Sequence, residues 1–269
     1  MATPPNPPLE SEPQILPPAE FIPVASHLED PPWTGWSVLW ITLFGVLSIA
    51  VLGTVTVFIV QKMFYPHSAL GVVAEYPLVA ITAQVVVYIA LFLFMVSVVN
   101  WRGLPFWRSV RWTWPRNPFA YLLGGIVLSL ALQAIAHFLP MPKELPMDKF
   151  FQTERQAWVL AIFGTTLAPL MEELFFRGFL YPVLARRTGV AISVFITSLA
   201  FSLIHAPQLG RAWGPVLVIF LVGLTFTIVR VVTKSVATGF LMHVAYNGTL
   251  SILLYIATDR FRHLERINQ

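Results

Sequence analysis

Long apolar stretches are the feature that most constrains how this chain can fold. A helix of about 20 apolar residues spans the roughly 30 Å hydrocarbon core of a bilayer, and several stretches approach or exceed this length. They cover residues 37–60, 78–99, 119–139, 157–184, 190–205, 214–229 and 235–256. The sequence therefore predicts an all-α polytopic membrane protein, a bundle of about 7–8 transmembrane helices. The higher count applies if the 157–184 stretch, which Pro169 and Pro182 interrupt, forms two segments.

The composition excludes most other classes of protein. Hydrophobic residues make up 57% of the chain and charged residues only 11%, whereas a soluble domain has about 25% charged residues. A transmembrane β-barrel would show alternating segments of about ten residues, and the sequence has no such pattern. The net charge of +4 comes from cations in short loops, which favours anchors at the lipid bilayer over a nucleic-acid partner. The absence of cysteine excludes disulfides, thiolate-bound zinc and a cysteine nucleophile.

Changes in composition divide the chain into four regions. Residues 1–32 are rich in proline and acidic side chains, which is typical of a disordered tail. Residues 33–156 contain the N-terminal transmembrane helices and interfacial loops. Residues 157–256 contain the later helices, in which the polar intramembrane residues lie, and residues 257–269 form a basic polar tail.

The loop at residues 100–118 interleaves arginine with tryptophan, a composition typical of the membrane interface. The positive-inside rule favours placing this loop and the N-terminus in the cytoplasm. Seven spans would then leave the basic C-terminal tail outside, whereas an eighth crossing would bring it inside, so both topologies stay open. The predicted location is a multi-pass position in the cell membrane, the inner membrane if the source is bacterial.

Three charged residues lie inside one of the most apolar stretches. A charge at the centre of a bilayer costs about 2.5 kcal/mol or more, so Glu172, Glu173 and Arg177 are expected to have partners or a function. Arg177 follows Glu173 by four residues, which suits an ion pair on one helix face. Glu172 is rotated by about 100° from Glu173 and has no such partner, so it is the candidate general base. The alternative is that all three residues form one structural salt-bridge cluster.

Two later helices supply further polar side chains. His205 ends one apolar stretch, and His243 and Asn247 are four residues apart in the last one, so they share a helix face. An unsatisfied buried polar group costs about 1–3 kcal/mol, and these helices have few other polar groups to serve as partners. We therefore expect these residues to meet the two carboxylates and the arginine in one intramembrane site.

These residues resemble the motifs of a known family. Residues 172–177 match the EExxxR motif of the CPBP family, the Abi-like CAAX-protease and bacteriocin-processing membrane proteases. Residues 201–205 match its FxxxH motif and residues 243–247 its HxxxN motif, in the family's order. The resemblance covers about residues 157–256. It implies helices around a polar intramembrane cavity, and an endopeptidase that hydrolyses a peptide bond near the membrane face, as eukaryotic members do on prenylated CAAX proteins.

The resemblance also implies a role for each site residue. Glu172 would activate the attacking water beside His205, His243 and Asn247 would stabilise the oxyanion, and Glu173 and Arg177 would orient the site. A peptide or membrane-protein substrate is implied as partner. The family has been described both as metalloproteases and as metal-independent glutamate proteases. The cofactor is therefore either none or zinc, and the zinc candidates are Glu172, His205 and His243.

Two interpretations without proteolysis compete with this one. A membrane scaffold or bacteriocin-immunity-type protein would keep the polar cluster for structure or partner binding. A proton-coupled transporter would also need buried carboxylates and histidines, but the sequence shows no internal repeat of the kind many transporters have. The protease is the leading hypothesis because three motifs occur in the family's order.

Overall fold

The computed structural model describes Met1 and residues 30–265, and this part of the chain is helical throughout, without a strand. The expected disorder of the proline-rich tail concerns positions that lie almost entirely outside the described residues. Six helical segments within residues 30–265 are long and apolar enough to cross a membrane. A further apolar helix, α10 (Val190–His205), is shorter than these six, so the count is close to the predicted seven or eight. The prediction of an all-α, multi-pass integral membrane protein is confirmed.

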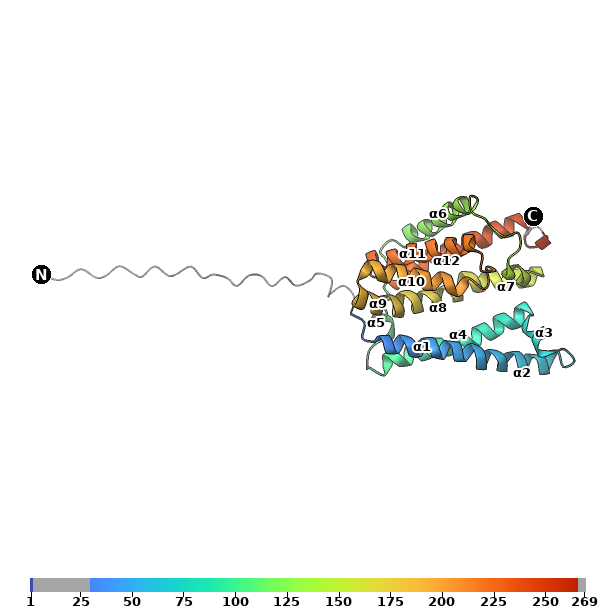
Figure 1. The fold of residues 1–269 in the computed structure, drawn as a ribbon, viewed down its shortest axis with the longest axis horizontal. Helices are drawn as coiled ribbons and strands as arrows, with labels where there is room; N and C mark the ends of the chain where they lie inside the picture. The colour runs from blue at the N-terminus through green and yellow to red at the C-terminus, as the bar shows by residue number, and fades with distance from the viewer. Residues whose placement is uncertain (2–29, 266–269) are drawn as a thin grey trace.

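The first crossings form a separate layer, blue to cyan in Figure 1. Its first helix is continuous from α1 (Gly35–Ser48) through a π-helical turn, η2 (Ile49–Gly53), into α2 (Thr54–Phe64). After the short α3 (Leu70–Ala74), the chain returns as α4 (Pro77–Asn100). Proline suits the first position of a helix, because the missing N–H would be unpaired there anyway. The layer covers one side of the polar core and contributes no charged side chain to it.

The helices opposite this layer pack closely because glycine allows their backbones to approach. The short interfacial helix α5 (Phe106–Ser109) leads into α6 (Pro118–Ala136), which packs against α12 (Val236–Ala257). A Cβ atom at Gly125 of α6 would lie 2.3 Å from the backbone oxygen of Met242. Small residues at helix contacts are the usual means of close packing in membranes.

The segment that carries the two glutamates is a broken helix. It comprises α7 (Glu154–Thr165), α8 (Leu167–Glu173), the π-helical η4 (Leu174–Leu180) and α9 (Tyr181–Thr188). Regular helix geometry fails at Thr166, where φ is −119° and ψ is −74°. The interruption that the sequence predicted is therefore present, as a break within one 35-residue segment. π-helical turns are rare and often occur at functional sites.

The remaining helices complete the wall around the polar residues. From α9 the chain turns into α10, continues through α11 (Trp213–Thr233) and ends in α12. The path alternates between two ends of the bundle, so that α1 begins at the end where α5 and α9 lie and α12 finishes at the other (Figure 1). We call the end of the bundle at which α5 and α9 lie the α5 end.

Candidate active site

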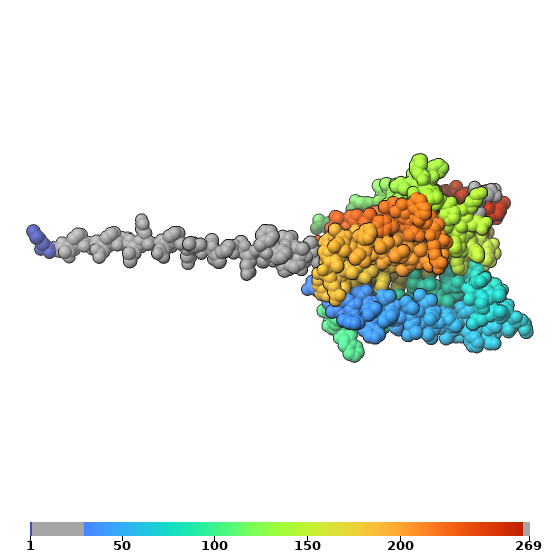
Figure 2. All heavy atoms as spheres, viewed as in Figure 1, coloured from blue at the N-terminus to red at the C-terminus, as the bar shows by residue number. Residues whose placement is uncertain are grey.

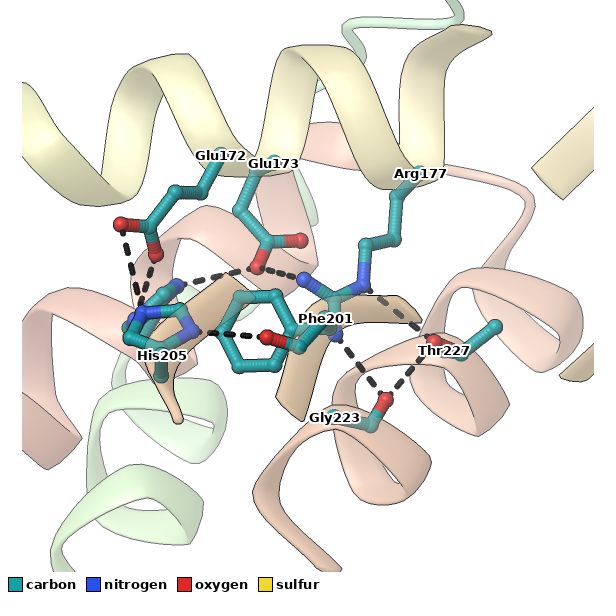
Figure 3. A network of polar contacts seen from close by, with 8 residues as sticks. Glu172, Glu173, Arg177, Phe201, His205, Gly223 and Thr227 are labelled. Carbon is teal, nitrogen blue, oxygen red and sulfur yellow. Dashed lines mark hydrogen bonds and ion pairs between the residues drawn. The ribbon is translucent and has the colours of Figure 1, made fainter. Parts of the chain in front are cut away.

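Glu173 and Arg177 form a sealed ion pair at the junction between α8 and η4. Arg177 Nη1 donates to Glu173 Oε1 over 2.9 Å, and both side chains have 0% exposure. The ion pair predicted from the four-residue spacing is therefore present (Figure 3). A buried pair of this kind is stable only when the remaining donors and acceptors are also satisfied.

The partners that satisfy Arg177 come from α11. Its Nη2 donates to the Gly223 carbonyl over 3.0 Å and its Nε donates to Thr227 Oγ1 over 3.3 Å. The guanidinium also lies 4.6 Å from the ring centre of Phe201, within the range of a cation–π interaction. Gly223 and Thr227 were not among the site residues predicted from the sequence. Their signal was a glycine and a threonine four residues apart, on one face of an apolar helix.

His243 lies between the two glutamates. Its Nδ1 is 3.0 Å from Glu173 Oε1, and its Nε2 is 3.6 Å from Glu172 Oε2. Glu173 pairs with Arg177 and is therefore a carboxylate, which only accepts hydrogen bonds. The proton of a neutral His243 consequently resides on Nδ1, and its Nε2 presents a lone pair towards Glu172.

His205 approaches Glu172 from the end of α10 in the same tautomer. Its Nδ1 lies 2.7 Å from the Phe201 carbonyl, which can only accept, so the neutral ring carries its proton on Nδ1. Its Nε2 is 3.8 Å from Glu172 Oε1. The side chains of His205 and Glu172 are 18% and 15% exposed. Figure 3 shows this pair beside the sealed Glu173–Arg177 network.

Glu172, His205 and His243 cannot form direct hydrogen bonds with one another. Two neutral imidazoles present lone pairs to a carboxylate, and the separations of 3.6 and 3.8 Å exceed hydrogen-bonding distance. A proton donor between them removes the conflict, since a water about 2.8 Å from each of two groups bridges separations in this range. The arrangement therefore favours a water molecule that donates one proton to Glu172 and one to an imidazole.

Asn247 lies on α12, one turn beyond His243, and its side chain contacts a different helix. Its Nδ2 donates over 2.7 Å to the carbonyl of Gly164, near the end of α7. The last four carbonyls of a helix have no partner within that helix, so this bond caps the break before α8. Asn247 was predicted from the sequence to join the polar cluster, whereas one of its two amide hydrogens bonds to the backbone of α7.

Gly239 allows α12 to approach Glu173. A Cβ atom at this position would lie 2.7 Å from Glu173 Oε2, an atom that accepts no hydrogen bond from the described residues. Gly239 precedes His243 by one helical turn, so the close approach also fixes the height of the imidazole. Gly239 was not among the site residues predicted from the sequence.

We expect Gly239→Ala to destabilise the protein by about 1–3 kcal/mol, the usual cost of overpacking, and to lower activity by displacing His243. Gly53→Ala is the matched control, because nothing lies within 4 Å of a Cβ atom at Gly53. Reversible unfolding in mixed micelles measures both variants. Equal stability of the two would show that α12 does not depend on this contact.

The candidate zinc ligands are not arranged as a metal site. Glu172, His205 and His243 have suitable donor atoms, but the described residues contain no group of three or more His, Asp or Glu side chains that could hold a metal ion. The separations between the carboxylate oxygens and Nε2 atoms, 3.6 and 3.8 Å, are also wider than the roughly 3.3 Å expected of ligands with bonds near 2.0 Å in tetrahedral geometry. We therefore derive no step through a metal.

The segment that builds this site matches a known family. The family described as type II CAAX prenyl endopeptidase Rce1-like matches residues 154–249, which contain every predicted site residue. No curated protein and no solved structure matches the chain. The matched part extends from the start of α7 into α12 and leaves α1 to α6 outside. Over residues 154–249, this chain is therefore similar to the CAAX-protease (CPBP) family of membrane proteases, the family that the sequence motifs resemble.

Proposed function

We propose that this protein is an intramembrane endopeptidase in which Glu172 activates a water molecule for attack on a peptide bond. The observation that carries the proposal is the position of one accessible carboxylate between two imidazole Nε2 atoms, at 3.8 Å from His205 and 3.6 Å from His243. The neighbouring ion pair is sealed, which leaves Glu172 as the carboxylate that a substrate and water can reach.

In the proposed reaction, Glu172 takes a proton from the water while the oxygen of that water attacks the carbonyl carbon of the substrate. His205 Nε2 accepts the second hydrogen bond of the water and orients it. When the carbon–nitrogen bond breaks, the proton held by Glu172 passes to the departing amine, and a carboxylic acid is the other product. General acid–base catalysis of this type contributes about 10²- to 10⁴-fold to the rate.

Stabilisation of the oxyanion is assigned to α12. In this role His243 takes up a proton on Nε2 from solvent before the attack and keeps it throughout, so that Nε2 donates to the oxyanion, and the Glu173 carboxylate, 3.0 Å from Nδ1, stabilises the imidazolium. Asn247 supplies the amide hydrogen that the Gly164 carbonyl does not use. Preorganised donors of this kind stabilise a developing oxyanion in a site that excludes water.

The substrate class follows from the membrane location and the family description. A site enclosed by transmembrane helices acts on polypeptides held in or at the bilayer, and the matching family is named for CAAX prenyl endopeptidases. We propose a membrane-associated peptide or protein whose scissile bond reaches Glu172 near the membrane face.

Substitution of His205 tests the proposal. His205→Gln is expected to lower cleavage of a membrane substrate by about 10²-fold or more, because glutamine cannot offer an unprotonated ring nitrogen to the water. The matched control, His137→Gln, changes an exposed histidine near the end of α6 and is expected to retain activity. Cleavage is measured by mass spectrometry after reconstitution. Undiminished cleavage by the His205 variant would refute the assignment.

A further inference from the structure

At the α5 end of the bundle, exposed basic residues lie in or beside the segments that join α4 to α6, α9 to α10 and α11 to α12, and almost no carboxylate of the described residues accompanies them. These basic residues are Arg102, Arg108, Arg116, Arg186, Arg187 and Lys234. Among the described residues, the only carboxylate at this end is Asp30, which pairs with Arg186 over 3.1 Å. The loops at the opposite end mix both signs of charge, with Lys143, Glu144, Asp148, Lys149, Glu154 and Arg155 in one of them.

Exposed tryptophans surround the same basic end. Trp36, Trp101 and Trp114 are 68%, 92% and 61% exposed. In Figure 2 the green segment that joins α4 to α6 projects from the bundle here. Tryptophan favours the headgroup level of a bilayer, where an apolar ring and a polar N–H are both accommodated. The α5 end therefore has the composition of a surface in contact with lipid headgroups.

One groove on this surface combines a cation with apolar walls. It has a volume of about 290 Å³ and is lined by Gly35, Trp36, Leu39 and Arg187. The guanidinium of Arg187 lies 3.2 Å from the position that a Cβ atom would take at Gly35, so the glycine lets the arginine rest against the start of α1. No carboxylate of the described residues pairs with Arg187. Leu39 continues the groove along the apolar face of α1.

We propose that this groove binds an anionic phospholipid, with the headgroup phosphate on Arg187 and an acyl chain along Leu39. The planar guanidinium matches the oxygens of a phosphate, and the excess of cations over carboxylates among the described residues of this end favours a lipid with net negative charge over a zwitterionic one. The site is independent of the proposed peptidase chemistry.

A second groove at the opposite end provides a matched control. It is lined by Thr153, Glu154, Arg155, Trp158, Val159 and Ile162. It therefore also offers an arginine, a tryptophan and aliphatic side chains, but a carboxylate lies beside the arginine. Its neighbouring charges are mixed, so it is not expected to select anionic lipid.

The experiment uses the purified full-length protein, stripped of lipid and then offered an equimolar mixture of phosphatidylglycerol and phosphatidylcholine. Native mass spectrometry counts the lipids retained. We expect a several-fold preference for phosphatidylglycerol, lost in Arg187→Gln and kept in Arg155→Gln. Equal retention of the two lipids by the unchanged protein, or equal loss in both variants, would overturn the proposal.

Two further arms separate the groove from a general charge effect and from free phosphate. Leu39→Trp fills the groove without changing any charge and is expected to reduce retention of phosphatidylglycerol. An unchanged preference in this variant would show that surface charge, and not the groove, selects the lipid. Millimolar inorganic phosphate is expected to leave lipid retention unaltered, and displacement of the lipid by it would identify free phosphate as the ligand.

Discussion

Replacing Glu172 by glutamine is expected to reduce cleavage by about 10²- to 10⁴-fold while leaving the fold intact. Glutamine has nearly the same size and still forms hydrogen bonds, but it cannot take a proton from water. The side chain of Glu172 is 15% exposed, and its contacts with His205 and His243, at 3.8 and 3.6 Å, are longer than hydrogen bonds, so little stability depends on it. Single-turnover cleavage in micelles, together with the unfolding temperature, measures the two effects separately.

The control for this variant is Glu154→Gln, which removes an exposed carboxylate from the same broken helix, in the first turn of α7. It is expected to cleave at the rate of the unchanged protein. If Glu172→Gln also cleaves at that rate, Glu172 is not the base. If it loses activity only together with its folded structure, the carboxylate has a structural function, as the scaffold interpretation requires.

The same variant serves to identify the substrate and the metal requirement. An inactive but folded protein is expected to retain uncleaved polypeptides that the unchanged protein releases, and mass spectrometry of the two sets of bound proteins reveals them. Incubation of the unchanged protein with a chelator provides a separate comparison. Loss of cleavage that zinc restores would add a metal to the proposed chemistry.

Replacing Arg177 by methionine is expected to have the largest effect on stability, a loss of about 3–5 kcal/mol. The substitution leaves the Glu173 carboxylate fully buried without a cation, and His243 alone remains beside it. Arg186→Met is the control. That arginine forms an exposed pair with Asp30, and exposed pairs contribute about 0–1 kcal/mol. Reversible unfolding in mixed micelles measures both variants.

A double substitution separates the structural role of the pair from its role in catalysis. Glu173→Leu combined with Arg177→Met removes both buried charges and is expected to regain most of the lost stability, because apolar replacement of a buried pair is often neutral. Activity is not expected to return, since His243 Nδ1 loses the carboxylate that fixes its tautomer. A cost below about 1 kcal/mol for Arg177→Met would show that the pair behaves like an exposed one.

Local sequence was sufficient wherever a property depends on one helix. The apolar stretches predicted the transmembrane helices to within a few residues for most of the chain, because length and hydropathy decide whether a helix spans a bilayer. The four-residue spacing predicted the Glu173–Arg177 pair, because neighbours at that spacing share a helix face. The three motifs indicated which helices would contribute to the site, and the family match over residues 154–249 agrees with them.

Contacts between helices could not be read in the same way. The four-residue spacing of Gly223 and Thr227 places them on one face of α11, but it does not show that this face receives the remaining donors of Arg177, since that depends on the rotation of α11. Asn247 shares its helix with His243, yet its amide contacts the end of α7 because the chain breaks at Thr166. The approach of α12 to Glu173 likewise depends on a glycine that has no polar signature.

The sequence by itself determined that this chain is a helical membrane protein with two carboxylates, an arginine and two histidines in its apolar segments. Only the tertiary structure decided how the two glutamates differ. Glu173 is fully buried, with Arg177 and His243 both bonded to one of its oxygens, whereas the side chain of Glu172 is 15% exposed. The physical reason is that the burial of each glutamate depends on which neighbouring helix packs against its side of α8. Sequence spacing fixes only the angle between the two side chains.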